Sequence, residues 1–430
     1  MWYIDYEFMN LDLSKINTSK ILSARKVFFI GIGGIGISAI ARMMHLEGKD
    51  ISGSDMSEGE LTRELQELGI KITIGQGFEL IPKDTDLIVY TIAIPHYDPK
   101  LFEQIKNSGI EMRSYPQTLG IVTANKFTIA VAGTHGKTTT TAMIAKILVD
   151  AGLDPSVVVG SLLKDYKSNL IVGHSEYFVV EACEYERSFL NIHPKLLVIT
   201  NIEADHLDYY KDLEDIQGAF KELEGQSENV IKDYSRYLDK VPKLLVPGVH
   251  NRLDAAASLA VADFLKIDLK VAQNSLETFQ GTWRRLEKKG TTSEGTIVYD
   301  DYAHHPTEIK ASLQGLRELY PNKNITVLFQ PHLYSRTKAL FDDFAKSFKG
   351  ADRILLLPIY FAREAKDESI SSEKLGEAIS KNGENAQAFP DFESAERVVS
   401  SLNLGKDDIF VTMGAGEAYK VAEKVFNTQN

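Results

Sequence analysis

Short apolar runs rich in β-branched residues recur along the chain, and most lead through a turn into a stretch with helical spacing of its apolar positions. This alternation is typical of α/β domains whose strands pair in parallel. The predicted strands are 26–30, 50–54, 70–74, 87–91, 127–132, 177–182, 196–200, 296–299, 326–329, 353–357 and 408–412.

The stretch 211–250 is less regular than the rest. It predicts a helix at 213–223 and a strand at 243–246. Asn251 has the side chain of an N-cap, so we expect it to begin a helix over 252–265.

The chain has 430 residues, which is longer than a domain with a single hydrophobic core usually is, so we expect two or three domains. With 43% hydrophobic and 25% charged residues, the composition is that of a folded globular protein. We place the domains at 25–122, 123–280 and 281–430, after a leader of residues 1–24 to which we assign no function.

Charge and cysteine content narrow the class of protein. A net charge of −12 disfavours nucleic acid or an anionic membrane as the main partner. The single cysteine, Cys183, excludes an intrachain disulfide and fits a reducing compartment, and we expect it to be a small buried residue. No apolar run predicts a membrane span or a secretory signal, so we expect a cytoplasmic enzyme.

A predicted phosphate loop joins the strand 127–132 to a helix ending near residue 151. The turn Gly133-Thr134-His135-Gly136 precedes Lys137 and Thr138. Backbone N–H groups at such a helix start bind phosphate, the lysine reaches the β- and γ-phosphates, and the hydroxyl coordinates Mg²⁺. The pattern departs from the usual one because Val131 occupies the first glycine position. The sequence therefore predicts a nucleoside triphosphate site.

A second glycine-rich turn, Gly31 to Gly36, lies between the strand 26–30 and a helix, with Asp55 about twenty residues farther on. This is the dinucleotide-binding fingerprint in its usual context. By itself it indicates a diphosphate at a helix N-terminus, so an NAD-dependent oxidoreductase stays an alternative, as do glycines needed only for packing.

Glu181 and His206 follow the ends of two predicted strands. Ligands collect at the carboxyl ends of strands in open α/β sheets, so both side chains are candidates for a Mg²⁺ site, although histidine is softer than the usual ligand. The alternative is an acid that caps a helix and a surface histidine.

Turn motifs near strand ends and helix starts hold six of the ten histidines: His135, His206, His250, His304, His305 and His332. This concentration indicates chemistry rather than chance placement. Arg284 and Arg285 lie in a predicted linker, where they are either solvated or directed at phosphate.

The motifs GIGGIG, AGTHGKTTT, EACE, TNIEADHLD, HN, GTWRR, DDYAHHP and FQPHLYSRT occur in the order in which the Mur ligases carry them. The chain resembles this family from Lys26 to the C-terminus. The resemblance implies three α/β domains: an N-terminal Rossmann-like domain, a central P-loop ATPase-like parallel sheet and a C-terminal Rossmann-like domain. It also implies a ligase that uses ATP and two Mg²⁺ ions to join UDP-N-acetylmuramate to L-alanine through an acyl phosphate, as a monomer or homodimer.

The resemblance also assigns site residues. It implies that the UDP-sugar is bound by Gly31, Gly33, Gly34, Ile35, Gly36 and Asp55, and that ATP is bound by Gly133, Thr134, His135, Gly136, Lys137, Thr138, Thr139, Asn251, Arg285 and Asp301. It assigns the metal to Thr138, Glu181 and His206, and the orientation of the amino acid to His332 and Arg336. The catalytic residues that it implies are Lys137, Glu181, His206, Arg285 and His305.

Several positions depart from the family pattern. The stretch between Asp208 and His250 is short, so the central domain is reduced, and Asp254 and Leu333 replace an expected asparagine and an arginine found in some members. A relative that attaches a preformed tripeptide to the same sugar, and a nucleotide-binding relative without catalysis, are the remaining alternatives.

Overall fold

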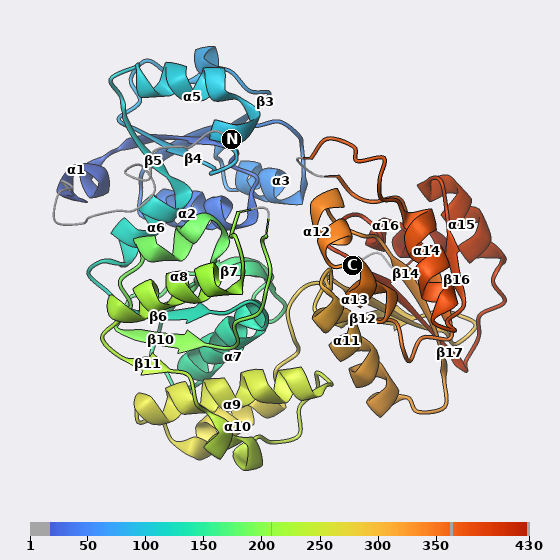
Figure 1. Cartoon of the computed structure of the whole chain (residues 1–430). Coiled ribbons are helices and arrows are strands. Elements are labelled where there is room, and N and C mark those ends of the chain that lie inside the picture. Colours follow the sequence, from blue (N-terminus) through green and yellow to red (C-terminus); the bar gives the residue numbers. More distant parts are fainter. Residues whose placement is uncertain (1–17, 208, 362–363, 428–430) are drawn as a thin grey trace. The chain divides into compact units, whose positions relative to one another are not determined.

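The computed structural model of the chain describes residues 18–207, 209–361 and 364–427. These residues form two compact units, shown in Figure 1. The first comprises the chain up to Ala204 together with Asp212–Lys240 and Ala255–Leu276, and it holds two sheets. The second comprises Asp205–Lys211, Val241–Asp254 and the chain from Glu277 onward, and it holds the third sheet. The predicted class, three α/β domains, is confirmed.

The first sheet is parallel throughout and has the order β3-β2-β1-β4-β5. The order in which strands are added reverses between β1 and β4, which places the ligand crevice of the Rossmann type at their carboxyl ends. The elements are β1 (Lys26–Ile30), β2 (Asp50–Asp55), β3 (Lys71–Ile74), β4 (Leu87–Tyr90), β5 (Glu111–Ser114), α1 (Thr18–Ser23), α2 (Ile35–Leu46), α3 (Glu60–Glu67), η3 (Phe78–Leu80), α4 (Ile94–Tyr97), α5 (Pro99–Lys106) and α6 (Tyr115–Thr123).

The second sheet has the order β11-β10-β6-β9-β7-β8, and only the β7–β8 pair is antiparallel. Its central strand β6 is almost fully buried and leads directly into α7. The elements are β6 (Phe127–Ala132), α7 (Lys137–Asp150), β7 (Ser156–Leu163), β8 (Ser168–Ile171), β9 (Tyr177–Glu181), η4 (Tyr185–Asn191), β10 (Leu196–Ile199), α8 (Leu213–Gly225), β11 (Val230–Ile231) and η5 (Ser235–Lys240), after which come α9 (Val249–Phe264) and α10 (Leu269–Glu277).

The third sheet has the order β12-β13-β17-β14-β15-β16, with β12 antiparallel to β13 and the other pairs parallel. Successive residues of β14 enter different cores: Val327 packs in one apolar cluster and Leu328 in the other. The elements are β12 (Glu287–Thr291), β13 (Ile297–Asp301), α11 (Pro306–Leu319), β14 (Asn324–Phe329), α12 (Tyr334–Ala339), α13 (Phe341–Ala345), β15 (Arg353–Leu356), α14 (Ser372–Lys381), β16 (Ala386–Ala388), α15 (Phe392–Ser401), β17 (Asp408–Met413) and α16 (Tyr419–Phe426).

Two local predictions are wrong. Residues 243–246 form no strand, because this short apolar run finds no neighbouring strand to pair with. Asn251 lies inside α9 instead of capping it, since the helix begins earlier, at Val249. Of the leader, residues 1–17 lie outside the described part. Among the described residues, no helix is both long enough and apolar enough to cross a bilayer.

Candidate active site

Two glycines shape the phosphate loop between β6 and α7. Gly133 has a φ of +143°, and a Cβ at this position would lie 1.9 Å from the hydroxyl oxygen of Thr200. Gly136, the N-cap of α7, is left-handed with a φ of +79°. A side chain at either position is therefore strained. The loop leads into the N-terminus of α7, whose N–H groups and partial positive charge are the features that bind anions.

Lys137 directs its ammonium group into this loop. The Nζ donates to the carbonyl oxygens of Gly133, at 2.6 Å, and Thr134, at 3.0 Å, and to Glu184 Oε1, at 3.0 Å. The Glu184 side chain is only 3% exposed. Burial, the largest single effect, opposes the lysine charge, but the Glu184 carboxylate and further negative groups that include Glu181 together outweigh it, so the pKa of Lys137 is raised. A permanent positive charge is thus held where phosphate oxygens would bind.

Thr138 and Glu181 come together beside the lysine. The Thr138 hydroxyl lies 3.1 Å from Oε1 and 3.0 Å from Oε2 of Glu181. Glu181 Oε2 also accepts the backbone N–H of Gly160 at 2.8 Å. A hydroxyl and a carboxylate are the hard oxygen donors that Mg²⁺ prefers. The donor set therefore fits a magnesium ion at the end of β9.

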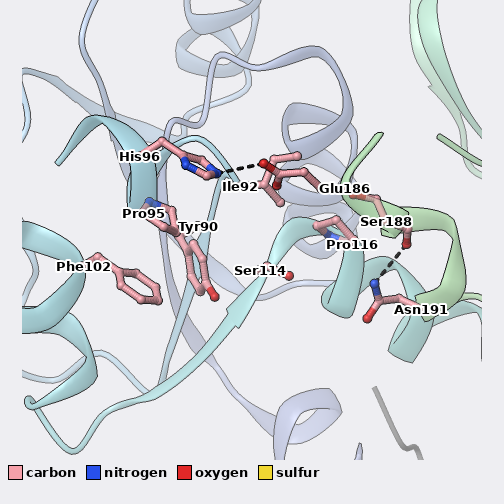
Figure 2. Close-up of a pocket in the computed structure, with 10 residues that line it drawn as sticks. All are labelled: Tyr90, Ile92, Pro95, His96, Phe102, Ser114, Pro116, Glu186, Ser188 and Asn191. Atoms are coloured by element: carbon pink, nitrogen blue, oxygen red, sulfur yellow. Dashed lines mark hydrogen bonds and ion pairs between the residues drawn. The ribbon is translucent and has the colours of Figure 1, made fainter. Parts of the chain in front are cut away.

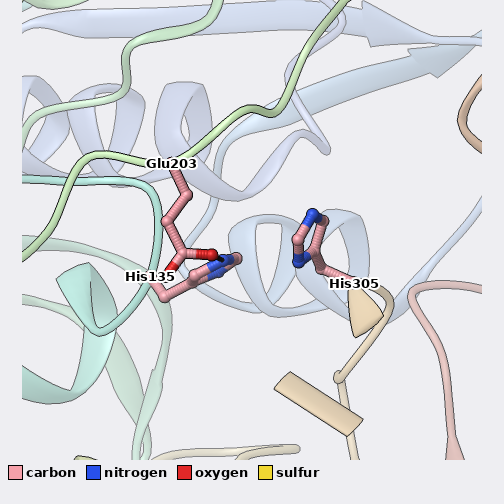
Figure 3. Close-up of side chains that lie close together, drawn as sticks. All are labelled: His135, Glu203 and His305. Atoms are coloured by element: carbon pink, nitrogen blue, oxygen red, sulfur yellow. Dashed lines mark ion pairs between the residues drawn. The ribbon is translucent and has the colours of Figure 1, made fainter. Parts of the chain in front are cut away.

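The loop after β10 forms hydrogen bonds with the phosphate loop. Asn201 Oδ1 accepts the N–H of His135 at 2.9 Å, and Thr134 Oγ1 accepts the N–H of Glu203 at 2.8 Å. The His135 ring lies 3.6 Å from the Glu203 carboxylate, as Figure 3 shows. The first part of the TNIEADH motif therefore fixes the shape of the nucleotide loop.

The first glycine loop, Gly31 to Gly36, uses some of its own N–H groups internally. Asp55 Oδ2 accepts the N–H of Gly33 at 2.8 Å, and Ser54 accepts from Gly31 at 2.8 Å. Asp55, which is predicted to lie near a nucleoside, thus also stabilises the conformation of the loop. The first turn of α2, which starts at Ile35, has N–H groups without partners inside the helix, and such groups can bind an anion.

Tyr115, at the start of α6, packs against the first glycine loop. A Cβ on Gly36 would lie 2.5 Å from its hydroxyl oxygen, so only glycine leaves room for the ring. Burial, followed by the charge of Glu181, raises the pKa of Tyr115. The phenol therefore stays neutral, packed on the glycine loop and within electrostatic reach of the other site.

The antiparallel hairpin β7–β8 joins the two sheets of the first unit. Asn169, which is fully buried, donates to the Ile35 carbonyl and, at 3.1 Å, to Ser38 Oγ in α2. Arg42 donates to Ser168 Oγ at 3.0 Å. The helix that carries the first glycine loop is therefore fastened to the sheet that carries the phosphate loop.

Arg284 and Arg285, adjacent in the second unit, have different environments. Arg284 is 4% exposed and donates to Asp300 Oδ2 at 2.7 Å and to the carbonyls of Gly416, at 3.0 Å, and Gly414, at 2.7 Å. Arg285 is 29% exposed and lies 3.8 Å from Glu308. Arg284 is therefore neither solvated nor directed at phosphate, contrary to both expectations, whereas Arg285 keeps an accessible guanidinium.

His206 and Arg336 share one acid, Asp205. Arg336 donates to Asp205 Oδ1 from Nε at 3.2 Å and from Nη2 at 3.1 Å. The backbone N–H of His206 donates to the same oxygen at 2.7 Å. Arg336 Nη1 also lies 3.2 Å from Nδ1 of His332. Although burial opposes ionisation, His206 and Arg336 keep the pKa of Asp205 far below its usual range. Two predicted site residues, His206 and Arg336, thus contact an acid that was not predicted, and His332 joins the group through Arg336.

Asp301 and His305 lie at the end of β13. Asp301 is 4% exposed and accepts from the Ser312 hydroxyl, and burial raises its pKa to about 6. His305 is the N-cap of α11 and accepts the Thr307 N–H at Nδ1, at 3.3 Å, which places the ring proton on Nε2. The adjacent His304 has its pKa lowered to about 4 by burial.

The remaining predicted residues take simpler positions. Thr139 is buried in α7 behind the loop, and Asn251, 5% exposed, donates to the Pro247 carbonyl from inside α9. Cys183 is exposed, contrary to the prediction that it is buried.

The structure thus brings the predicted residues together in three groups. The glycine loop forms one, Lys137, Thr138 and Glu181 form the second, and His206, His332 and Arg336 form the third, which lies in the second unit. Sequence reasoning assigned no role to Glu184 and Asp205, although each acid lies within a recognised motif, and it had no signal for Tyr115.

Three family models match the chain. They are the catalytic domain of the Mur ligase family over residues 26–127, the Mur ligase middle domain over 131–243 and the Mur ligase glutamate ligase domain over 284–416.

Curated relatives match over nearly their whole length. UDP-N-acetylmuramate–L-alanine ligase of Clostridium novyi is 41% identical, with 93% of this chain and 96% of the relative covered. The enzyme of the same name from Agathobacter rectalis is 40% identical over 95% and 98%.

Solved structures agree with these relatives. UDP-N-acetylmuramate-alanine ligase MurC of Thermotoga maritima has a TM-score of 0.80 at 27% identity, with 94% of this chain and 98% of that chain covered. A murein peptide ligase of Psychrobacter arcticus has a TM-score of 0.67 at 22% identity, over 94% and 98%, and shares the fold.

Proposed function

The chain belongs to the Mur ligase family, and we propose that it joins the carboxylate of UDP-N-acetylmuramate to the amine of L-alanine at the expense of ATP, in peptidoglycan precursor synthesis. The observation that carries this proposal is the match to the alanine ligase of Clostridium novyi at 41% identity over 93% of the chain. We infer that the reaction takes place in the cytoplasm, because it needs ATP and a nucleotide sugar and because the single cysteine fits a reducing compartment.

The reaction needs activation because a carboxylate does not accept an amine in neutral water. The carboxylate oxygen attacks the γ-phosphorus of ATP, the bond to the β-phosphate oxygen breaks, and ADP leaves. The alanine nitrogen then attacks the acyl carbon, phosphate departs with the C–O bonding pair, and the nitrogen loses a proton. The protein must position these groups, neutralise phosphoryl charge and exclude water.

Lys137 supplies the fixed positive charge for the phosphates. Its ammonium already occupies the centre of the loop, and phosphate oxygens take the place of one of its present acceptors. Arg285 has an accessible guanidinium and supplies further charge from the second unit. His206, His305 and His332 are the candidates that receive the amine proton. Because His305 has its own proton on Nε2, it would accept the amine proton at Nδ1, in place of the Thr307 N–H.

Thr138 and Glu181 fit Mg²⁺ as hydroxyl and carboxylate donors, and Glu181 and His206 are proposed as the ligands of a second ion. When bound, the ions neutralise oxygens of the transferring phosphoryl group. The first glycine loop and Asp55 hold the UDP-sugar, and His332 and Arg336 orient alanine. Asp301 and Asn251 are proposed contacts of the ATP nucleoside.

One assay tests the proposal and its rivals. The protein is incubated with ATP, Mg²⁺ and UDP-N-acetylmuramate, and ADP release is measured with L-alanine, L-serine, glycine or the tripeptide. We expect release with L-alanine. Release with the tripeptide alone identifies a tripeptide ligase instead, and no release with any amine contradicts the ligase function.

A further inference from the structure

Glu186 is a buried carboxylate in η4 that the proposed chemistry does not use. Its side chain is 5% exposed, and Oε1 lies 2.8 Å from Nε2 of His96, a residue of α4 (Figure 2). The other oxygen, Oε2, is buried and has no hydrogen-bond partner within the described residues. Because an unsatisfied buried carboxylate oxygen is costly, it points to a group that binds there.

The backbone at this position is strained. Glu186 has φ 51° and ψ 32°, and Arg187 has φ 53° and ψ 24°, two consecutive left-handed residues that are not glycine. Each costs on the order of 1–2 kcal/mol. The Arg187 ion pairs with Asp215, at 2.9 Å, and Glu222, at 2.6 Å, hold this conformation against α8. Strain of this kind, maintained by outside contacts, is concentrated at ligand sites.

The carboxylate borders a cavity of about 40 Å³. A single water needs roughly 10–15 Å³, so the cavity admits a functional group of a few atoms but not a whole molecule. Its walls include Tyr90 and Ser114, which end β4 and β5. The cavity therefore lies at the carboxyl edge of the first sheet, the edge at which α/β sheets bind ligands.

The chemistry of the cavity restricts what enters it. An ionised carboxylate only accepts hydrogen bonds, so its partner must be a donor. Diphosphate and the substrate carboxylate are anions and are repelled. The hydroxyl and amide N–H groups of the sugar ring are neutral donors of suitable size.

We propose that Glu186 is a positioning residue for the sugar nucleotide, whose sugar ring places a hydroxyl or amide N–H in this cavity and donates to Oε2. The inference rests on the proposed function, from which it takes the substrate. It assigns to the central domain a direct contact with the sugar, in addition to the diphosphate contacts of the first glycine loop.

The test compares UDP with UDP-N-acetylmuramate by isothermal titration calorimetry. For Glu186→Gln we expect affinity for UDP-N-acetylmuramate to fall roughly 10-fold, because a charge-assisted hydrogen bond becomes a neutral one. Affinity for UDP, which lacks the sugar, stays within about twofold. Glu222→Gln is the matched control: it keeps the Glu186 carboxylate and removes the more exposed of the two Arg187 ion pairs. Because Asp215 still holds Arg187, it should change neither affinity.

Each outcome has a distinct meaning. An equal loss of affinity for both compounds in Glu186→Gln shows a structural role and overturns the inference, as does the absence of any loss. Thermal unfolding of each variant verifies that it is folded. A wild-type protein that binds UDP but not UDP-N-acetylmuramate overturns the proposed function, whereas wild-type binding of both without a variant effect overturns only the inference.

Discussion

The Thr138 hydroxyl contacts both oxygens of the Glu181 carboxylate, at 3.1 and 3.0 Å. A side chain from the start of α7 and one from the end of β9 thus form a ready pair of oxygen donors for a cation. Thr138→Ala removes one donor, so we expect turnover to fall roughly 100-fold and the Mg²⁺ concentration for half-maximal activity to rise. ADP release measured across a Mg²⁺ series provides the test. Thr138→Ser keeps the hydroxyl and should retain activity; equal loss in both variants contradicts the metal role.

Lys137 and Glu184 form a buried ion pair, with the carboxylate 3% exposed. Lys137→Ala should abolish ADP release and also lower the free energy of unfolding by about 3 kcal/mol, because it leaves an unpaired buried charge. Adding Glu184→Gln removes that charge and should restore part of the stability but none of the activity. Urea unfolding of both single variants and the double variant measures the coupling. If the losses of unfolding free energy in the two single variants add up to the loss in the double variant, the two side chains do not interact.

Arg284 and Arg285 are expected to respond in opposite ways to the same substitution. Arg284→Lys breaks contacts to one acid and two carbonyls in a buried site, so the unfolding free energy should fall by about 2–4 kcal/mol. Arg285→Lys should leave stability within about 0.5 kcal/mol but lower turnover roughly 100-fold. Denaturant unfolding and ADP release, measured on both variants, give the comparison. A loss of activity without loss of stability in Arg284→Lys would reverse this assignment.

Asp301 should make stability depend on pH in an unusual direction. Burial raises its pKa from 3.8 to about 6. Below pH 3.8 the carboxyl is protonated in both folded and unfolded chains and contributes nothing. Between the two values the folded chain binds more protons, so the unfolding free energy falls as pH rises, by about 3 kcal/mol in total, and stays lowered above pH 6.

The Asp301→Asn variant isolates this effect because asparagine does not titrate. Its unfolding free energy relative to wild type should therefore increase between pH 4 and pH 6 and level off above pH 6. Urea unfolding at unit pH intervals measures the difference. A difference that is constant with pH would show that the carboxyl is not destabilised by burial.

Sequence pattern predicted the elements that bury long apolar runs and failed where the run is short or polar. Strand β6 is buried along its length and was predicted to the residue, whereas β12, with the sequence EKKGT, gives no apolar signal. Strand pairing, as at 243–246, depends on neighbours that are distant in the chain.

The same limit applies to the site. Lys137 and Thr138 were found because a local motif carries them, and roles predicted for them remain to be tested by the variants above. Asp205 and Tyr115 acquire their importance from contacts with Arg336 and Gly36, far away in sequence. Motif reasoning identifies residues that act within one loop and misses those that act between elements.

The buried attachment of Asn169 to α2 bears on inhibitor design. Because it fastens the helix of the first glycine loop to the sheet of the phosphate loop, the separation of these two proposed anion sites is fixed within one compact unit. A bisubstrate compound with a uridine end and a polyphosphate end can therefore be given a single stiff linker. Once one end is bound, the other end would bind at a high effective concentration, and no free energy would be spent on changing the distance between the two sites.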